Sequence, residues 1–520
     1  MQKNLILAVV LSSLVYIGWY SYIQKKLPPP QTAGAAQTAV SRPGVPAAAA
    51  SQSAAPQAGA ETSVQEPGPL PADWMQKAVV ITSAKAKYYF VPGSASLAGA
   101  VYEGPVEPVE LVPDPSRGFF YSTLPGSFAL KSKTDASAEF VSRQGQLLLT
   151  KKFVMSRDGG LNSLEITAAN VSHRTAMLPA WELRIGPGLN TVDSEMKDNV
   201  KLCKADYAFS EKGRKHPTLK ELKSAPAEHA WVWAGLNNRY FLAALAGSSF
   251  SDARPFRRDA RVGKDDKTPM LVVPMPAVEL RPGETKTWTS QFYLGPKDYA
   301  MLQKLGLGLD RAVDFGFFAP LAKLANTSLV FFYHLTGNYG AAILILSVLI
   351  QLMLSPLSFK SYKAMAVMKK IQPEMKSIQE RYKSDPQRMN SEIMALYRRH
   401  GTNPLGGCLP MLLQIPVFFA LFTALRNSWD LHGAHFIFWI KDLSAKDPYY
   451  VLPLIMGGVM FLQQSLNPQT SDPAQAAMMK WMPVIFTFMF LHFPSGLVLY
   501  WLVNSTWGFA QSMYLKKTMG

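Results

Sequence analysis

Residues 340–357 read GAAILILSVLIQLMLSPL, an apolar stretch without a charged side chain. About 20 such residues cross the hydrocarbon core of a bilayer as a helix, so the stretch predicts a membrane-spanning helix. Its polar side chains Ser347, Gln351 and Ser355 recur every four residues and therefore fall on one face of that helix. Because polar groups at bilayer depth are costly, we expect this face to turn toward a cavity or a protein partner.

Further apolar stretches follow toward the C-terminus. They are Gly406–Leu425, Tyr449–Leu466, Trp481–Phe493 and Gly496–Leu515. At 1.5 Å per residue, Trp481–Phe493 reaches only about 20 Å against about 30 Å of hydrocarbon. We therefore expect Met478 to Lys480 to extend it by snorkelling, or the bilayer to be thin there. Pro494-Ser495-Gly496 predicts a tight turn before the last stretch.

The chain also begins with an apolar run, Leu5–Tyr22, which ends in aromatic residues and is followed by Lys25 and Lys26. A cleaved signal peptide is the alternative to a spanning anchor. The run is longer than a usual signal-peptide core, and it ends in aromatic rather than small residues. We predict an uncleaved anchor.

Between these regions the composition changes twice. Pro28 to Pro71 is rich in Ala, Pro, Gln, Ser and Gly, which predicts a flexible tether because so few large apolar residues cannot support a core. From Trp74 to about Pro296, short alternating runs are bounded by turn residues. Residues 147–155 and 164–167, separated by Asp158-Gly159-Gly160, predict one hairpin of an all-β sandwich. Residues 73–296 should therefore be separable as a soluble fragment.

The segment Ala312 to Leu335 is apolar with scattered polar residues and has Lys323 as its only internal base, which fits an interfacial helix better than a spanning one. The predicted organisation is an anchor over 1–26, a disordered tether over 27–72, an external β-sandwich over 73–296, an interfacial-helix region over 297–337, and a helical membrane core over 338–520 that includes a helical hairpin over 359–403.

About a third of the net charge of +17 lies in one loop. Ten bases lie between Phe359 and Asn403: Lys360, Lys363, Lys369, Lys370, Lys376, Arg381, Lys383, Arg388, Arg398 and Arg399. Four acids oppose them, and Lys516 and Lys517 add to the tail. Since basic loops stay in the cytoplasm, we predict six spans with both termini cytoplasmic and the β domain outside.

Apolar residues in the basic loop recur at spacings of three and four, which predicts two helices with a Met-rich seam. Asp385 and Pro386 fit the cap and the first position of the second helix. Either the two helices merely pack on each other, or the methionines form an adaptable surface for partners. The bases expected to contact ribosomes or clients are Lys369, Lys370, Lys376, Arg381, Arg398 and Arg399.

Several separated blocks resemble the YidC family of insertases, in its Gram-negative branch with a large periplasmic domain. They are Gly337-Asn338-Tyr339-Gly340, Asn403-Pro404-Leu405-Gly406-Gly407-Cys408-Leu409-Pro410, Gln414-Ile415-Pro416-Val417-Phe418, Asp442-Leu443-Ser444, Asp447-Pro448-Tyr449-Tyr450 and Phe493-Pro494-Ser495-Gly496-Leu497-Val498-Leu499-Tyr500-Trp501. The resemblance implies five core helices around a hydrophilic groove that is open to cytoplasm and lipid. It also implies a location in the bacterial inner membrane and a supersandwich-like β domain that is largely dispensable for insertion. The partners it implies are nascent membrane proteins as clients, the Sec translocon, and the ribosome, without other recognition of nucleic acids.

The residues expected to line such a groove are Ser347, Gln351, Ser355, Gln414, Thr487, Tyr500, Asn504 and Gln511. The alternative is ordinary hydrogen bonding between helices. Gln351 is expected to face the cavity without a helix partner, because apolar residues flank it. The family commonly has an arginine where this chain has Gln351, which here removes a long-range attraction for acidic client tails. Many relatives also have a basic C-terminal extension, so ribosome docking here is expected to rest mainly on the hairpin.

Other classes of function find little support. Gly-rich phosphate loops, His-Glu-x-x-His and Gly-x-Ser-x-Gly motifs are missing, so we predict neither an enzyme nor a cofactor. His432 and His435 have no Cys or carboxylate at metal-ligand spacing, so no metal site is predicted. Cys203 and Cys408 are predicted to lie in different compartments, so no disulfide is expected between them. A secondary transporter would need an inverted repeat or a charged midplane pair. A membrane-anchored glycan-binding protein is the alternative function, but it explains the β domain alone.

Overall fold

The computed structural model describes residues 68–214, 216–263, 265–401, 409–466 and 473–519. These fall into two compact units. One lies within Gln65–Met365 and Leu405–Gly520, and the other holds the described residues of Ala366–Pro404. The predicted anchor, and most of the predicted tether, lie outside the described residues.

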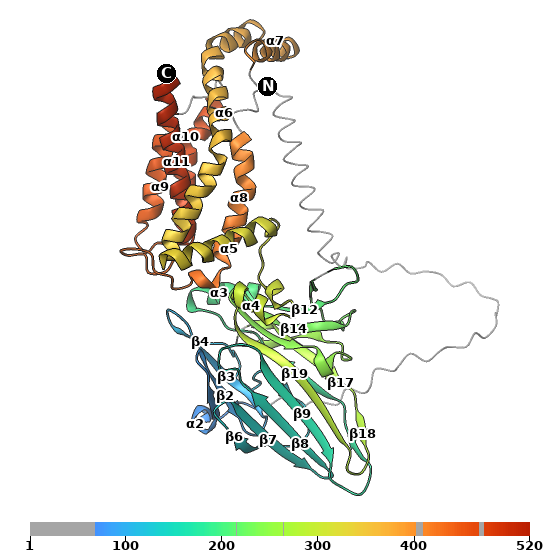
Figure 1. The fold of residues 1–520 in the computed structure, drawn as a ribbon. Helices are drawn as coiled ribbons and strands as arrows, with labels where there is room; N and C mark the ends of the chain where they lie inside the picture. The colour runs from blue at the N-terminus through green and yellow to red at the C-terminus, as the bar shows by residue number, and fades with distance from the viewer. Residues whose placement is uncertain (1–67, 215, 264, 402–408, 467–472, 520) are drawn as a thin grey trace, which may run out of the picture. The chain divides into compact units, whose positions relative to one another are not determined.

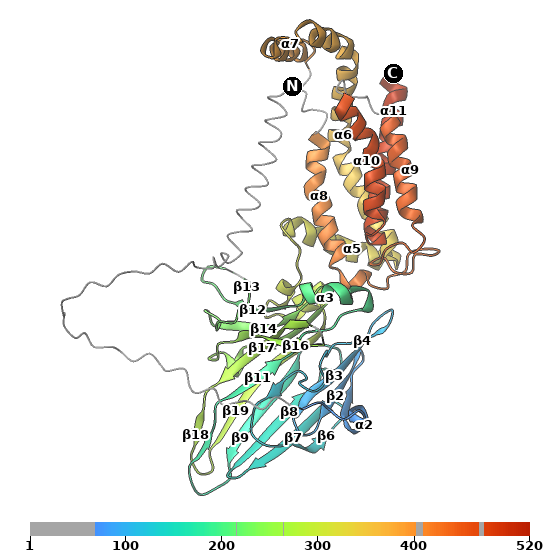
Figure 2. The same cartoon turned by 180° about the vertical axis from the view of Figure 1, so that it is seen from behind.

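The β domain contains four antiparallel sheets within the described residues (Figures 1 and 2). The largest has the order β13 (Thr218–Glu221), β12 (Lys204–Phe209), β14 (Trp231–Asn237), β15 (Phe241–Ala246), β19 (Thr285–Pro296), β9 (Asn162–Asn170), β8 (Leu147–Val154), β7 (Ser137–Gln144) and β6 (Ala129–Lys133). A four-stranded sheet has the order β1 (Val79–Thr82), β2 (Ala86–Val91), β3 (Ser96–Glu103) and β4 (Pro108–Glu110). A second four-stranded sheet has the order β16 (Phe256–Val262), β17 (Asp265–Met275), β11 (Trp181–Ile185) and β5 (Tyr121–Ser122). The last sheet pairs β10 (Ala176–Leu178) with β18 (Val278–Leu280). Short helices α2 (Trp74–Lys77), η1 (Asp193–Glu195), α3 (Met196–Leu202) and η2 (Ser248–Phe250) connect them.

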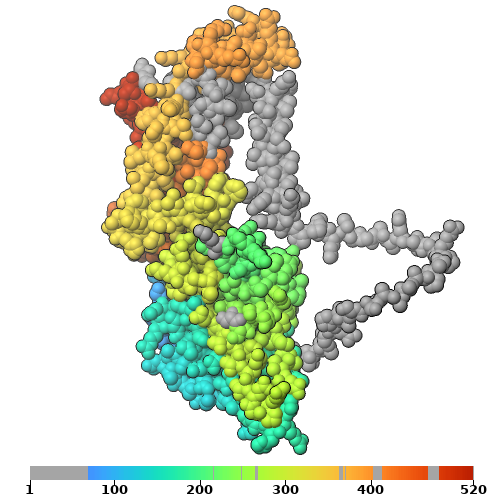
Figure 3. Space-filling model, turned by 45° about the vertical axis from the view of Figure 1, so that its right-hand side comes forward, coloured from blue at the N-terminus to red at the C-terminus, as the bar shows by residue number. Residues whose placement is uncertain are grey.

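The all-β prediction is confirmed, and so is the hairpin on which it rested. Strands β8 and β9 pair antiparallel with Phe153 opposite Leu164, and Asp158-Gly159-Gly160 lies in the connection between them. Burial alternates at every residue of β9, as expected for a strand with one face on a core. Side chains of this nine-stranded sheet share one hydrophobic core with residues of the two four-stranded sheets, so the domain is a sandwich. Figure 3 shows it as one continuous surface.

Part of the large sheet is buried on both faces. Along β15, Phe241, Ala243 and Leu245 join the sandwich core, whereas Leu242 and Ala244 belong to a second hydrophobic cluster on the opposite face. That second face is covered by α4 (Tyr299–Leu305) and η3 (Leu309–Ala312), through residues such as Leu302 and Leu309. The segment after the last strand is therefore packed on the sheet.

The C-terminal region is helical and follows the β domain in the chain. Its elements are α5 (Ala319–Thr336), α6 (Tyr339–Arg381), α7 (Pro386–Arg399), α8 (Leu409–Arg426), η4 (Trp429–Leu431), α9 (Val451–Leu466), α10 (Pro473–Phe490) and α11 (Ser495–Met519). The first half of α6 and helices α8 to α11 lie side by side, while α5 runs across them (Figures 1 and 2). The sequence predicted both the helices and the short link between α10 and α11.

Two predicted helix limits are wrong. Helix α10 begins at Pro473, and its 18 residues reach about 27 Å, so the apolar run understated its length. Helix α6 continues through Pro356 into the basic loop as one helix of 43 residues. Proline is tolerated inside membrane helices because neighbouring groups satisfy the freed carbonyl, so a proline after an apolar run does not mark a helix end.

By length and composition, one helical segment among the described residues, Tyr339–Ser361, is long and apolar enough to cross a membrane. Three other apolar segments are shorter: Leu413–Arg426, Val451–Leu466 and Met479–Phe490. The number of spans therefore stays a prediction.

The smaller unit is a helical hairpin built from the end of α6 and from α7. Asp385 Oδ1 accepts a hydrogen bond from the backbone N–H of Arg388 at 3.1 Å, and Pro386 occupies the first helical position, so the predicted cap is confirmed. Ile371, Leu396 and Tyr397 form its core. Met375 packs there, and its sulfur accepts a hydrogen bond from the Tyr397 hydroxyl at 3.3 Å.

Candidate functional site

Polar side chains from three helices meet inside the helical bundle. The Gln351 amide of α6 donates to Asn504 Oδ1 of α11 at 2.5 Å, and the Gln414 amide of α8 donates to the Tyr500 hydroxyl of α11 at 2.6 Å. The Gln511 amide of α11 donates to Ser355 Oγ of α6 at 2.8 Å. We call this set the polar seam: Gln351, Ser355, Gln414, Tyr500, Asn504 and Gln511. It joins α11 to both α6 and α8 by side-chain hydrogen bonds.

The polar seam is largely closed to solvent. Tyr500 is 1% exposed, Gln351 6% and Gln511 8%. Its members on α11 recur at spacings of four and seven, which places them on one helical face. A buried amide that keeps its hydrogen bonds avoids most of the cost of desolvation. The arrangement therefore holds polar groups at depth in an otherwise apolar bundle.

Two of the residues predicted to line a groove lie outside this network. Ser347 is buried on the same stripe of α6, but its hydroxyl donates to the carbonyl of Ile343 in its own helix at 2.6 Å. Thr487 of α10 likewise donates to its own helix, at Pro483, and packs against Gly457 of α9, where any added Cβ would collide with it. Thr487 therefore belongs to the contact between α9 and α10.

Gln351 differs from the expectation in one respect: it has a helix partner, Asn504. The apolar neighbours of Gln351 gave no sign of this partner, which comes from a helix about 150 residues away. Sequence reasoning also missed Trp507, whose indole N–H donates to Ser355 Oγ at 3.2 Å. Its position, three residues after Asn504 and four before Gln511, was the available signal.

The loops at one end of the bundle bring together the blocks 337–340, 442–450 and 493–496. The block 403–410 lies largely outside the described residues. Asn338 caps α6 by accepting from the N–H of Ala341, and its amide donates to the carbonyl of Phe436 at 3.0 Å. Asp447 accepts from the N–H of Leu452 at 2.7 Å at the start of α9. Gly340 is obligatory for space, because a Cβ there would overlap the ring of Phe436. These residues fix where the helices start, which sets the register of the polar seam.

The same loops are tied to the start of α11. The N–H of Ser495 donates to the carbonyl of Ala445 at 2.7 Å, and the N–H of Gly496 donates to that of Leu443 at 2.9 Å. The turn before α11 is thus held by the loop that precedes α9. This explains in physical terms why the blocks 442–450 and 493–497 both carry turn and cap residues.

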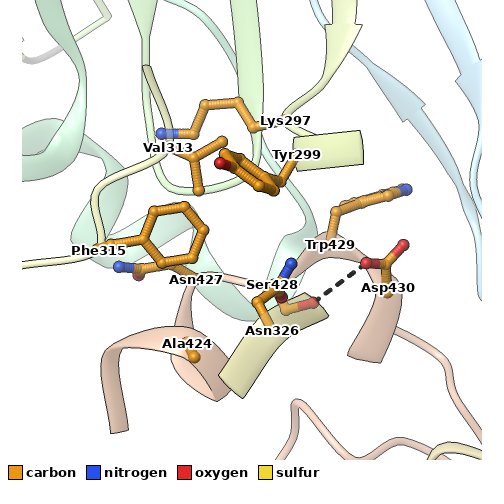
Figure 4. Close-up of a pocket in the computed structure, with 10 residues that line it drawn as sticks. All are labelled: Lys297, Tyr299, Val313, Phe315, Asn326, Ala424, Asn427, Ser428, Trp429 and Asp430. Carbon is orange, nitrogen blue, oxygen red and sulfur yellow. Dashed lines mark hydrogen bonds between the residues drawn. The ribbon is translucent and has the colours of Figure 1, made fainter. Parts of the chain in front are cut away.

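A small pocket lies among α4, the segment that follows η3, α5 and the residues at and just after the end of α8 (Figure 4). It has a volume of about 10 Å³, room for one water molecule at most. Burial lowers the pKa of Lys297 to about 8, and its amine donates to the carbonyl of Ala312 at 2.9 Å. Burial and then the nearby Asp298 raise the pKa of Asp430 to about 6. The pocket is a packed junction, too small for an organic ligand.

The candidate metal residues do not gather into a site. His432 Nδ1 lies 3.3 Å from Ser444 Oγ and 3.6 Å from a carboxylate oxygen of Asp442, and burial lowers the pKa of His432. Groups of three or more metal-ligating side chains are not found in the described part of the chain. His432 instead stacks on Trp429.

The basic residues predicted for the hairpin lie on its outer surface. The side chains of Lys370, Lys376, Arg381, Arg398 and Arg399 are exposed, and that of Lys369 lies outside the described side chains. The apolar seam is used internally, since Met368 and Met375 pack against the core of the hairpin. Of the two interpretations of the methionines, helix-on-helix packing accounts for these two.

Comparison with known proteins gives the chain its family. A family model described as the 60Kd inner membrane protein matches residues 331–520, and one described as the YidC periplasmic domain matches residues 109–325. A membrane protein insertase YidC from Endomicrobium trichonymphae is 42% identical over 397 residues, covering 74% of each chain. Another from Geobacter metallireducens is 35% identical over 556 residues, covering 100% of this chain and 99% of the relative. A crystal structure of an active YidC insertase with its first transmembrane domain resolved covers 84% of this chain and 92% of its own, at 17% identity and a TM-score of 0.40.

The chain belongs to the YidC family of membrane protein insertases. The YidC periplasmic model covers most of the β domain, and the inner-membrane model covers the helices from the end of α5 onward. Membership makes this a multi-pass inner-membrane protein with an all-β periplasmic domain. A glycan-binding anchor protein is not favoured, because the match extends through the helical region. The prediction that the protein is not an enzyme agrees with its membership in a family of insertases.

Proposed function

We propose that this YidC-family insertase passes client segments along the polar seam. The observation that carries the proposal is the set of three side-chain hydrogen bonds that join α6, α8 and α11. Each bond is between neutral groups, so opening it exposes amides and hydroxyls without exposing a charge. A client's polar flank can take over these bonds as it enters, which lowers its cost of leaving water.

The neutral character of the seam sets its preference among clients. At the position where the family commonly has an arginine, Gln351 can form hydrogen bonds but does not attract acidic client tails over a long range. We therefore expect the seam to accept uncharged polar tails readily and to favour acidic tails less than an arginine-bearing relative does.

Site-specific crosslinking tests this route. A photoreactive side chain at position 351 or 500 should capture a nascent client, whereas one at Met353, which is 73% exposed on α6, should capture mainly lipid. Equal client capture at Met353 and at the seam, or capture at Met353 alone, would contradict the route.

Substitution of Gln351 separates a client path from a purely structural hydrogen bond. If the seam is the path, Gln351→Leu slows insertion of clients with polar translocated tails while membrane abundance is unchanged, and Gln351→Arg is tolerated. If the bond to Asn504 is only structural, Arg buries an unpaired charge and lowers protein abundance, while Leu leaves insertion as it was. Measuring abundance and insertion rate at equal expression distinguishes the two.

The proposed topology has six spans with both termini in the cytoplasm, supported by the excess of Lys and Arg over residues 359–403. Helix α5 then lies at the outer interface, which its exposed apolar side chains Leu324, Phe331 and Leu335 support. Lys323 fits this place, since its amine lies 5.2 Å from the ring centre of Tyr299. The Sec translocon and the ribosome are proposed partners, the ribosome through the exposed bases of the hairpin.

A further inference from the structure

A hollow of about 540 Å³ lies between the end of α9 and the C-terminal part of α11. Its lining comes from one stripe of each helix: Leu462, Ser465 and Leu466 on α9, and Phe509, Met513, Lys516 and Lys517 on α11. This volume lies in the usual range of small-ligand sites. The polar seam takes no part in it.

The hollow lies on the C-terminal side of Gly508 on α11, next to a close contact between α9 and α11. Gly508 lets the amide of Gln463 approach α11 closely, since a Cβ at Gly508 would collide with it. The described part of α9 extends to Leu466, three residues after Gln463, and α11 runs on for eleven residues past Gly508 to Met519.

The lining combines an apolar wall with two cations at one end. Leu462 is 51% exposed and Met513 is 52% exposed, so both leave about half of their apolar surface uncovered. Lys516 and Lys517 are exposed, and within the described part of the chain neither forms an ion pair or a hydrogen bond. An apolar hollow with two adjacent lysines at one end is complementary to an amphiphile with a long hydrocarbon chain and an anionic head.

The site is separate from the polar seam. At 3.6 residues per turn, Phe509, Met513 and Lys516 fall on the opposite face of α11 from Tyr500, Asn504 and Gln511. A ligand in the hollow thus contacts the outer face of the bundle, where the bilayer supplies anionic phospholipid in excess.

We propose that this hollow binds an anionic phospholipid. Its phosphate lies on Lys516 and Lys517, and one acyl chain lies against Leu462, Leu466, Phe509 and Met513. The proposal does not depend on the route that clients take through the polar seam.

The test is native mass spectrometry of the full-length protein in detergent, titrated with phosphatidylglycerol or with phosphatidylcholine of the same acyl chains. Phosphatidylglycerol should remain bound at concentrations where phosphatidylcholine does not. The double variant Lys516→Gln/Lys517→Gln should bind phosphatidylglycerol on the order of 30-fold more weakly, from about fivefold per lysine at a membrane surface. Leu462→Trp, which narrows the apolar part of the hollow and keeps both lysines, should also weaken binding.

Matched controls make the result decisive. Lys370→Gln/Lys376→Gln removes the same charge from the hairpin and should leave lipid binding unchanged, as should Lys516→Arg/Lys517→Arg. Inorganic phosphate should not displace the lipid, because it lacks the acyl chain. The proposal is overturned if both lipids bind equally, if the hairpin variant loses as much lipid as the Lys516/Lys517 variant, if phosphate displaces the lipid, or if Leu462→Trp has no effect.

Discussion

At the scale of single residues, Lys151 has the least expected environment in the β domain. Its side chain is fully buried, its amine donates to the carbonyl of Phe120 at 2.9 Å, and the ring centres of Phe128 and Phe153 lie within 6 Å. Burial lowers the pKa of Lys151 to about 7. Because the folded domain binds the proton less tightly than the unfolded chain, the free energy of unfolding should rise with pH between about 7 and the ordinary lysine value, and be lost as pH falls back to about 7.

Lys151→Met should remove this pH dependence. We expect the wild-type β domain to gain on the order of 2 kcal/mol of stability between about pH 7 and about pH 9, and the variant to gain much less. The measurement is urea unfolding of the full-length protein in detergent, read out by pulse proteolysis of the β domain. Parallel pH profiles for both proteins would show that Lys151 is not the titrating group.

Within the polar seam, Tyr500 and Gln414 should be energetically coupled. Tyr500→Phe leaves the Gln414 amide without its acceptor and should cost about 1 kcal/mol, in the range measured for polar pairs between membrane helices. If Gln414→Leu is already present, the added cost of Tyr500→Phe should nearly vanish. A double-mutant cycle of unfolding in detergent measures this coupling, and strictly additive costs would mean that the bond contributes nothing.

At the scale of elements, helix α7 of the hairpin begins at an N-cap. Asp385→Ala removes the acceptor for the Arg388 N–H and should destabilise α7 by about 1 kcal/mol. Hydrogen exchange should become about fivefold faster for the first turn of α7, while amides of α5 keep their rates. Asp385→Asn should retain most of the protection. If the alanine variant exchanges at the wild-type rate, the cap does not stabilise the hairpin.

The exposed bases of the hairpin carry the proposed contact with ribosomes. Reversing Lys369, Lys370, Lys376 and Arg381 to Glu should weaken ribosome binding, more strongly at low salt than at high salt because exposed charges are screened over about 8–10 Å. The corresponding Lys→Arg changes keep the charge and should bind normally. A ribosome affinity that is the same for the Glu variant and the wild type would remove the hairpin from this role.

At the scale of the whole molecule, the β domain is not complete at its last strand. Leu242, Ala244 and Trp233 on its outer face are covered by Leu302 and Leu309, which follow the strand β19. Trp429, from the loop after α8, also packs into the sandwich core, with its ring centre 5.0 Å from that of Phe241. Residues beyond Pro296 therefore shield apolar surface of the sandwich.

A soluble fragment should for this reason extend past Pro296. We expect residues 73–316 to be monomeric and to bind little hydrophobic dye, whereas residues 73–296 should bind the dye strongly and tend to associate because a patch of the sheet is uncovered. Both fragments lack Trp429, so the comparison isolates the 297–316 segment. Size-exclusion chromatography and dye fluorescence are the measurements. Equal behaviour of the two fragments would show that α4 and η3 add nothing to the solubility of the domain.

The sequence by itself determined the β and helical halves of this protein, the β8–β9 hairpin, the cap at Asp385 and the family, because alternation, helical periodicity and cap residues are local signals. It also named the six residues of the polar seam, though not Trp507 beside them, since a polar residue in an apolar stretch is visible without a structure. Only the tertiary structure decided which of them pair. Gln351 meets Asn504 while Thr487 meets Gly457, because such contacts depend on how helices far apart in the chain are brought together. The longer α10 carried a local signal, because Pro473 suits the first position of a helix and Ala474, Ala476 and Ala477 favour its continuation. The unbroken α6 and the covered outer face of the β-sheet were decided by packing, for which no short stretch of sequence carries a signal.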